Sequence, residues 1–413
     1  MRRRDFLKMS AAAANAVALD QTLFPAILRS EVLATAPASP RANGNLDRHR
    51  FGVNYVPSKN WWFCWNDWDR DSIMRDLDAI AAIGADHLRV QSIWPYFQPN
   101  PNWVSPPHLE RLDGLLTLMG ERNLDALVTV FTGQLSGWFF LPSFNRAGDG
   151  FFTDDMVWTA QEVLIRELAQ VSKSHEIFIG FDLGNELNTC WSAQPSVGDA
   201  WMKKMFSFID SIMPGYLNIN GVDQAPWFET ATFSPQALVA DQHIAVMHCY
   251  PLWAGSLKYG GAMDPPSVNL LASMAALIRS YAGTQQKPIW AGEFNTCIQS
   301  LPDKEQAQWL EKAVLAAMEE GVSWFTYWDS HDLDHKFAFG PEEYSLGLLT
   351  NSGAVKPQGR MFKELADAYR GKPVAFPSRS LPPPPATERN TEASWQWMLD
   401  WMGWQPKAEE IKS

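Results

Sequence analysis

The chain has 413 residues, of which 46% are hydrophobic and 19% charged, a balance that predicts a large buried core and excludes a disordered or collagen-like protein. Acidic residues (46) outnumber Lys and Arg (34), so the net charge is -12 and neither nucleic acid nor an anionic membrane surface is an expected partner. No window of about 18 nearly uncharged apolar residues predicts a membrane-spanning helix.

The first 38 residues resemble an export signal of the twin-arginine type. The run Arg-Arg-Asp-Phe-Leu-Lys at positions 3–8 precedes a mildly apolar stretch, and small residues follow up to Ala36 and Ala38. We therefore expect residues 1–38 to be removed and the mature protein to be periplasmic or secreted. Because twin-arginine passengers are exported folded, export does not by itself imply disulfides among Cys64, Cys190, Cys249 and Cys297.

Between residues 48 and 372, short apolar runs alternate with longer amphipathic ones, which is the pattern of repeated strand–helix units. Eight runs are predicted as strands: Phe51–Tyr55, His87–Gln91, Ala126–Phe131, Ile177–Leu183, Tyr216–Gly221, Ile244–His248, Pro288–Gly292 and Ser323–Tyr327. The helices predicted between them include Asp71–Ile83, Thr153–Ser172, Val197–Ile212, Ser267–Tyr281, Lys304–Glu319 and Lys356–Tyr369. This predicts an α/β fold, a single (β/α)8 TIM barrel over residues 48–372. An open doubly wound sheet would need a glycine-rich phosphate loop after an early strand, and the sequence has none.

Two segments follow the predicted barrel. Residues 373–387 contain the run Ser-Leu-Pro-Pro-Pro-Pro and predict an extended, solvated linker. Residues 388–413 form an aromatic amphipathic tail, with apolar side chains at helical spacing that include Trp395, Trp397, Trp401 and Trp404. We interpret the tail as a helix folded back onto the barrel. The alternatives are an element that forms an oligomer and an aromatic arm that reaches a substrate groove.

Two glutamates stand directly after buried, strand-like runs. The sequence at the end of the fourth predicted strand reads Asp-Leu-Gly-Asn-Glu, and its last residue is Glu186. At the end of the seventh predicted strand it reads Trp-Ala-Gly-Glu, and its last residue is Glu293. A barrel of this class builds its active site at the carboxyl ends of several strands. A single carboxylate at such a position could be a structural ion-pair partner. Two of them favour a catalytic role, because burying a carboxylate is costly unless it forms an ion pair or takes part in a reaction. Glycoside hydrolysis uses such a pair: one group protonates the leaving oxygen, and the other attacks the anomeric carbon or activates water.

On these residues the sequence resembles clan A of the glycoside hydrolases, and within it family 5. The resemblance implies that Glu186 is the acid/base and Glu293 the nucleophile, with no metal and no cofactor. It also implies substrate-site roles for residues that match the family in chain order: Arg89 orients the nucleophile, Asn185 binds the sugar 2-hydroxyl, His248 lies near the acid/base, Tyr250 contacts the nucleophile, and Trp328 forms the floor under the reacting sugar.

The two glutamates are expected to differ in pKa. The cation of Arg89 should lower the pKa of Glu293 and keep it ionised for covalent attack. Repulsion from ionised Glu293 should raise the pKa of Glu186, so that it can act as an acid. This pairing predicts retention of configuration, which requires carboxyl groups about 5–5.5 Å apart.

The expected partner is a carbohydrate, because the 20 tryptophans offer flat faces that stack on sugar rings. The aromatic-rich runs at 51–68 and 133–142 resemble most an exo-acting β-mannosidase branch of family 5, in which crowded loops leave a pocket for a terminal sugar. They could equally line an open groove, as in an endo-β-mannanase or an endo-β-1,4-glucanase (cellulase). A noncatalytic carbohydrate-binding protein is the rival class, which the presence of both glutamates disfavours. Further candidate substrate contacts are Trp138 and Trp253 as stacking platforms, Asn54 after the first strand, and Gln134, where many family members carry His or Asp.

Overall fold

The structure is a computed structural model, and it describes residues 46–296, 301–385 and 389–406. The predicted export signal, residues 1–38, lies outside the described residues, as does Cys297. The thiols of Cys64, Cys190 and Cys249 are free. No helix in the described part of the chain is long and apolar enough to cross a membrane.

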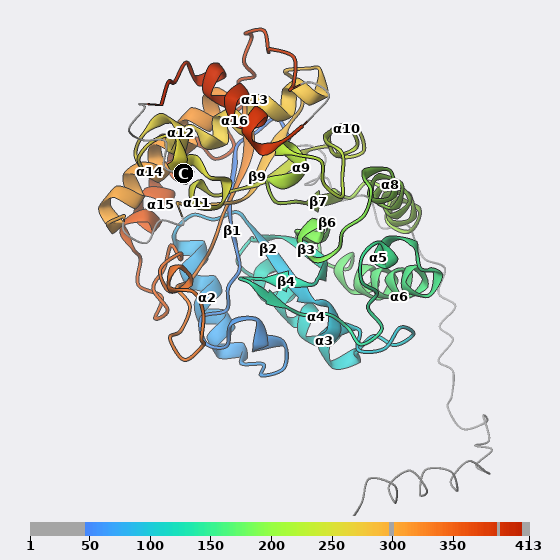
Figure 1. Cartoon of the computed structure of the whole chain (residues 1–413). Coiled ribbons are helices and arrows are strands. Elements are labelled where there is room, and N and C mark those ends of the chain that lie inside the picture. The colour runs from blue at the N-terminus through green and yellow to red at the C-terminus, as the bar shows by residue number, and fades with distance from the viewer. Residues whose placement is uncertain (1–45, 297–300, 386–388, 407–413) are drawn as a thin grey trace, which may run out of the picture. The chain divides into compact units, whose positions relative to one another are not determined.

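Eight parallel strands form the centre of the fold, and each of them was predicted (Figure 1). In chain order they are β1 (Arg50–Asn54), β2 (His87–Ile93), β3 (Asp125–Thr132), β6 (Phe178–Asn185), β7 (Ile219–Gly221), β8 (Ala245–Cys249), β9 (Ile289–Phe294) and β10 (Val322–Tyr327). Hydrogen-bonded neighbours follow the order β7-β6-β3-β2-β1-β10-β9-β8. The two ends of this order meet where the N–H of His248 donates to the carbonyl of Val222 over 3.3 Å. The strands thus form a nearly closed barrel, which confirms the (β/α)8 prediction.

Helices surround the strands (Figure 1). The predicted ones are present as α2 (Arg70–Ala82), α6 (Asp155–Ser172), α8 (Pro195–Ile212), α13 (Leu270–Ala282), α14 (Asp303–Glu319) and α15 (Pro357–Tyr369). The structure adds α4 (Pro106–Gly120) and α10 (Pro235–Ala240), and it separates α12 (Pro265–Val268) from α13. Short elements in the loops are η1 (Trp61–Trp65), α3 (Trp94–Phe97), β4 (Gln134–Leu135), β5 (Trp138–Phe139), α5 (Gly150–Thr153), α7 (Leu187–Cys190), α9 (Ala225–Phe228), α11 (Pro251–Ala254), η2 (Ser256–Lys258) and η3 (Pro341–Tyr344).

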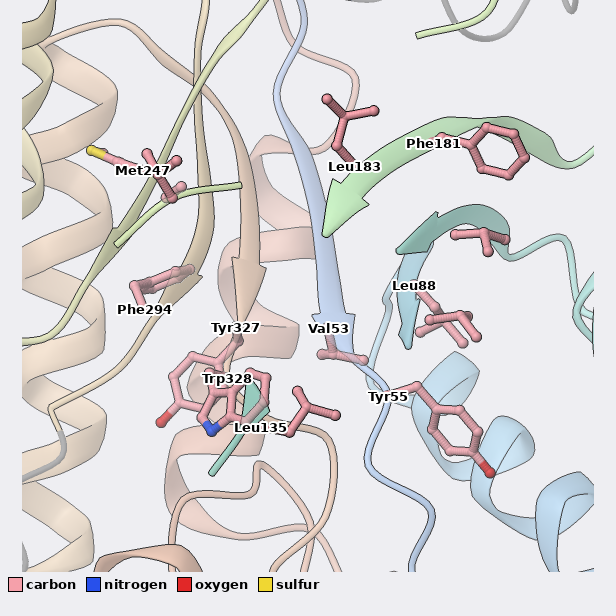
Figure 2. Close-up of a cluster of buried hydrophobic side chains, with 14 of the residues drawn as sticks. Val53, Tyr55, Leu88, Leu135, Phe181, Leu183, Met247, Phe294, Tyr327 and Trp328 are labelled. Carbon is pink, nitrogen blue, oxygen red and sulfur yellow. The ribbon is translucent and has the colours of Figure 1, made fainter. Parts of the chain in front are cut away.

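Side chains fill the interior of the barrel. His87 on β2 contacts Trp290 on β9, with ring centres 5.6 Å apart, although two strands separate them in the sheet, so both point inward. The hydroxyl of Thr326 joins them, 2.7 Å from a ring nitrogen of each. Trp290 belongs to a cluster of strand and strand-end side chains with Leu127, Ile179, Val246 and Trp324. A second, larger cluster packs strand residues against the helices, and Figure 2 shows its members Val53, Leu88, Phe181, Met247 and Phe294. The barrel is therefore a packed core and not a channel.

The segment after the barrel does not form a free spacer. Residues 373–385 lack a helix or strand, as expected, but Arg379 pairs with Glu320 at the end of α14, with Nη2 and Oε1 2.6 Å apart. The carbonyl of Arg379 accepts from Gln285 over 2.6 Å, and the carbonyl of Pro383 accepts from Trp397 over 2.9 Å. No residue of 373–385 is buried, as expected of a solvated segment, and these contacts tie it to both the barrel and the tail.

The aromatic tail forms α16 (Thr391–Met402), which packs on the barrel helices. Trp395 is 1% exposed, and its Nε1 donates to the carbonyl of Ala254 over 2.7 Å. Its ring stacks on Tyr259 with centres 4.9 Å apart, and the hydroxyl of Ser394 donates to the carbonyl of Phe228 over 2.7 Å. The folded-back helix is thus the arrangement found, while an oligomer formed through the tail stays a prediction.

The Trp395→Ala variant is expected to lose about 3–5 kcal/mol of unfolding free energy, because it removes a fully buried indole and leaves the Ala254 carbonyl without its donor. Thermal and denaturant unfolding measure this loss. The matched control is Gln396→Ala, an exposed neighbour on the same helix, which should melt like the parent chain. Equal melting of both variants would show that α16 does not contribute to the folded barrel.

Candidate active site

Glu186 directly follows β6, and its backbone adopts an unusual conformation. Its φ of 49° and ψ of 53° lie in the left-handed region, which costs a residue other than glycine about 1–2 kcal/mol. The N–H of Glu186 donates to the carbonyl of Gly221 on neighbouring β7 over 3.1 Å, so the barrel holds this turn in place. Strained backbone of this kind is concentrated at functional sites, and here the side chain lines a cavity.

Glu293 lies within β9, and its side chain is 4% exposed. Arg89 donates from Nη1 to Oε1 over 2.5 Å, and the hydroxyl of Tyr250 donates to Oε2 over 2.6 Å. The same guanidinium donates from Nε to the carboxylate of Asp182 over 2.7 Å. A single buried cation therefore serves two carboxylates.

His248, near the end of β8, lies between the two glutamates. Its Nδ1 is 2.9 Å from Oε1 of Glu186 and 3.5 Å from Oε1 of Glu293. One carboxylate oxygen of each glutamate and one ring nitrogen of His248 all lie within 4.8 Å of one another. Such a spacing fits carboxyl groups about 5–5.5 Å apart, the retaining arrangement, and not the inverting separation of about 6.5–9.5 Å. The same three groups could also ligate a cation, so the expected absence of a metal stays a prediction.

Burial raises the pKa of both glutamates. For Glu186, burial outweighs the attraction of Arg89 and brings the pKa to about 7. For Glu293, burial outweighs His248 and Arg89, so the pKa lies above the usual 4.5. The expectation of a lowered pKa for Glu293 is therefore wrong, because burial of the carboxyl group outweighs the lowering effect of Arg89. Burial lowers the pKa of His248 to about 4, which leaves its imidazole neutral near neutral pH.

The predicted contacts Asn185, Gln134, Trp328 and Trp253 all line the cavity. Asn185 accepts from Nη2 of Arg89 over 2.9 Å and donates to the carbonyl of Gln134 over 2.9 Å, so its amide orientation is fixed. Trp328, directly after β10, is buried, and Figure 2 shows it beside Tyr327. Trp253 is 46% exposed and sits edge-on to Tyr250, with ring centres 4.7 Å apart. Trp253 therefore offers an accessible aromatic surface.

The cavity has a volume of about 370 Å³. Its lining comes from loops after strands β3, β6, β7, β8 and β10 and from β9: Gln134, Ser136, Gly137, Asn185, Glu186, Asp223, Gln224, Tyr250, Trp253, Glu293, Trp328, Gly340, Glu342 and Glu343. Its volume is at the small end of the roughly 300–1,000 Å³ typical of ligand pockets. Arg89 and His248 do not line it but bind the glutamates that do.

Three acidic residues of the cavity were not predicted. Asp223 follows β7 by two residues, so the strand-end pattern that identified Glu186 applies to it as well. Its Oδ1 accepts from Nδ2 of Asn188 over 2.6 Å. Burial, together with repulsion from Glu186, raises the pKa of Asp223 to about 7. The other two, Glu342 and Glu343, lie in η3 of the long loop after β10, where no sequence pattern distinguishes them from surface residues.

Two predicted contact residues do not reach the cavity. Asn54 is fully buried, donates to the carbonyl of Gly292 over 3.0 Å and accepts from Nη1 of Arg89 over 3.1 Å. It therefore positions Arg89 and does not meet a sugar. Trp138 is 40% exposed and stacks on Phe339, with ring centres 5.2 Å apart, outside the cavity lining.

The site can be compared with known families. Residues 46–334 match the family model Cellulase (glycosyl hydrolase family 5). The chain belongs to glycosyl hydrolase family 5. As a member of family 5 it is a glycosidase, which hydrolyses O-glycosyl bonds. No curated protein sequence matches it.

Several solved structures resemble this family 5 chain. GH5_18 from Streptomyces cattleya in complex with GlcNAc is 31% identical, with a TM-score of 0.74 over 79% of this chain and 82% of that one. A GH5_18 variant from Bifidobacterium longum subsp. longum in complex with Manβ1-4GlcNAc is 28% identical, with a TM-score of 0.76 over 88% and 93%. An exo-β-1,4-mannosidase from Opitutaceae bacterium strain TAV5 is 25% identical, with a TM-score of 0.71 over 78% and 60%.

Proposed function

We propose that this family 5 enzyme is an exo-acting β-mannosidase, which releases terminal β-1,4-linked mannose from short saccharides such as Manβ1-4GlcNAc with retention of configuration. Three similar structures support the substrate: two GH5_18 proteins with GlcNAc or Manβ1-4GlcNAc bound, and an exo-β-1,4-mannosidase. The observation that supports the exo action is a small cavity whose lining loops continue directly into a cluster of packed aromatic side chains.

This cluster is an aromatic wall, which we define as Trp61, Phe63, Trp138, Phe337 and Phe339. It joins η1 after β1, the β4–β5 hairpin after β3 and the loop after β10. Its ring centres lie 4.6 Å apart for Trp61 and Phe339, 5.2 Å for Trp138 and Phe339, and 5.8 Å for Phe63 and Phe337.

The wall is continuous with the cavity lining along the chain. Ser136 and Gly137 line the cavity directly before Trp138, and Gly340 lines it directly after Phe339. The wall therefore fixes both loops at one end of the cavity. A small cavity beside loops fixed in this way is the basis on which we favour a chain end over the middle of a polymer.

In the first step, the carboxylate of Glu293 attacks the anomeric carbon while Glu186 donates its proton to the glycosidic oxygen, which leaves with the rest of the saccharide. Arg89 and Tyr250 each bind one oxygen of Glu293, so they hold the carboxylate in position for attack. A covalent mannosyl-enzyme results, in which Glu293 is an uncharged ester.

In the second step, Glu186 takes a proton from water, and the water oxygen attacks the anomeric carbon and displaces Glu293. Esterification removes the charge of Glu293 and with it the repulsion between the two carboxylates, so that Glu186 can ionise and act as the base. Two displacements at one carbon release mannose in its original β configuration.

The pH profile of kcat/KM is expected to be bell-shaped. Glu186 must be protonated, and its pKa of about 7 means that activity falls as pH rises through that value. Glu293 must be ionised, and its raised pKa places the acidic limb above the usual 4.5. Initial rates on p-nitrophenyl β-mannoside between about pH 4 and pH 9 measure both limbs.

Asp223→Asn is the variant that checks this assignment, because it removes a negative charge that interacts with Glu186. The alkaline limb should then move to lower pH, whereas the acidic limb should stay in place. An alkaline limb far above neutral pH in the parent enzyme would contradict the assignment of Glu186 as the acid.

The product profile tests the proposed function. The purified enzyme is given p-nitrophenyl β-mannoside, β-glucoside and β-galactoside, Manβ1-4GlcNAc, manno-oligosaccharides and mannan, and products are followed by chromatography with and without a chelator. We expect turnover of the β-mannosides and release of mannose alone, unchanged by the chelator. A spread of oligosaccharides from mannan or cellulose, with little aryl-mannoside turnover, would identify an endo-acting enzyme instead.

We also propose that the enzyme acts after export to the periplasm or beyond. The twin-arginine-type sequence within residues 1–38 supports this location. Cell fractionation of the full chain and of a variant with Arg3 and Arg4 changed to Lys tests it. Equal distribution of both chains would contradict export by this route.

A further inference from the structure

Glu343 is a buried carboxyl group of the cavity that the mechanism above does not use. It is 6% exposed and lines the cavity. Among the described residues no basic side chain forms an ion pair with it, and the hydroxyl of Ser136 is the polar group that favours its ionised form. A carboxyl group buried in this way is costly unless hydrogen-bond donors meet it. The cavity is where a ligand would supply them.

The backbone around Glu343 is held in place before any ligand binds. Its N–H donates to the carbonyl of Gly340 over 3.1 Å. The hydroxyl of the next residue, Tyr344, accepts from the N–H of Phe339 over 2.9 Å and donates to the carbonyl of Phe337 over 2.5 Å. Both phenylalanines belong to the aromatic wall. Glu343 is therefore presented to the cavity by a fixed loop, as a recognition group must be.

The acidic groups give the cavity two different ends. Burial raises the pKa of Glu343 to about 7, and repulsion from Glu293 contributes to this. For Asp223, the charged group whose repulsion raises the pKa is Glu186. In the double displacement the nucleophile faces the sugar that is transferred, and the acid/base faces the leaving group. Glu343 lies in the loop after β10, which also supplies the cavity residue Trp328, whereas Asp223 accepts from Asn188, two residues after Glu186. We therefore assign Glu343 to the end that holds the terminal sugar, and Asp223 to the end that holds the leaving group.

We propose that Glu343 binds hydroxyl groups of the terminal sugar that are remote from the cleaved bond, and that it selects the sugar by these contacts. The two oxygens of a carboxylate accept hydrogen bonds from hydroxyl groups, and the bonds between Tyr344 and the wall residues Phe337 and Phe339 hold the Glu343 loop in place for this contact. The identity of the sugar as mannose rests on the proposed function, whereas the contact itself rests on the geometry of the cavity.

The test combines enzyme variants with substrate analogues. Glu343→Gln keeps the shape of the side chain and removes its charge, and the matched control Asp334→Asn makes the same change in the same loop outside this cavity. Both are assayed with p-nitrophenyl β-mannoside and its 3-deoxy, 4-deoxy and 6-deoxy analogues. The parent enzyme should lose about 10- to 100-fold in kcat/KM on at least one analogue.

The decisive result is the absence of a further loss. On the full mannoside, the kcat/KM of Glu343→Gln should be lower than that of the parent enzyme by about the factor that the parent enzyme loses on that analogue. On the analogue that lacks the bound hydroxyl, kcat/KM of the variant should fall no further, because the contact is already missing. Asp334→Asn should behave like the parent enzyme on every substrate. Thermal melting of each variant shows whether it is folded.

Two results with the Glu343→Gln variant would overturn the proposal. One is a loss in Glu343→Gln by the same factor on all four substrates, and the other is full activity of that variant. The parent enzyme supplies a second measurement, because full activity on every deoxy analogue would also exclude the contact. Failure of the proposed function would give a different result, because the parent enzyme would then not hydrolyse p-nitrophenyl β-mannoside. Glu343→Gln would in that case be compared with the parent enzyme on the aryl glycoside that the parent enzyme accepts and on its deoxy analogues.

Discussion

Replacement of Glu293 with alanine is expected to lower kcat on p-nitrophenyl β-mannoside by at least about 10⁴-fold, because it removes the carboxylate that forms the covalent intermediate. The fold should survive the change. Arg89 keeps its hydrogen bonds to Asp182 and Asn185, so the buried cation is not left without partners. Initial rates of the purified variant measure the loss.

The matched control for Glu293→Ala is Glu311→Ala, which removes an exposed glutamate from α14. It should keep the kcat and the melting temperature of the parent enzyme. Retention of substantial turnover by folded Glu293→Ala would assign the nucleophile to another residue.

Replacement of Glu186 with alanine is expected to separate the two steps of the reaction. On Manβ1-4GlcNAc, which needs a protonated leaving oxygen, kcat/KM should fall by about 10²- to 10⁴-fold. On an aryl mannoside with a good leaving group the first step still proceeds, so the mannosyl-enzyme should accumulate. Azide, which needs no general base, should restore turnover and give β-mannosyl azide as the product. Stopped-flow release of the aryl group and product analysis measure these effects.

The control for Glu186→Ala is the parent enzyme, which azide should not accelerate. Because Asp223 lies near Glu186, the same azide experiment on Asp223→Asn shows whether Asp223 can take over the role of the acid/base. Full activity of Glu186→Ala on the unactivated disaccharide would contradict its assignment.

The barrel was predictable because each strand is a short buried run that alternates with an amphipathic helix. The same regularity placed Glu186 and Glu293 at strand ends, and the structure brings their carboxylate oxygens within 4.8 Å. Asp223 follows the same rule after β7 but was not recognised. The pattern that reveals Glu186 is therefore sufficient to find a second carboxyl group of the cavity.

Other features depend on contacts between distant segments, which the sequence does not reveal. Arg89 was expected to keep the pKa of Glu293 below its usual value, but burial of the carboxyl group by distant segments raises this pKa more than Arg89 lowers it. Trp138 was expected to stack on a sugar; one face of its ring packs on Phe339, 201 positions later in the chain, and the residue lies outside the cavity lining. Glu343 reaches the cavity only because its loop folds against the aromatic wall.

The central claim is that Glu293 forms a covalent bond to the sugar. The most direct measurement uses a 2-deoxy-2-fluoro-β-mannosyl fluoride, whose fluorine at carbon 2 slows breakdown of the glycosyl-enzyme while the fluoride leaving group allows its formation. Mass spectrometry of the intact protein, followed by peptide mapping, locates the sugar. We predict one sugar per chain, attached to Glu293. A label on another residue, or turnover of the reagent without any labelled protein, would contradict the account.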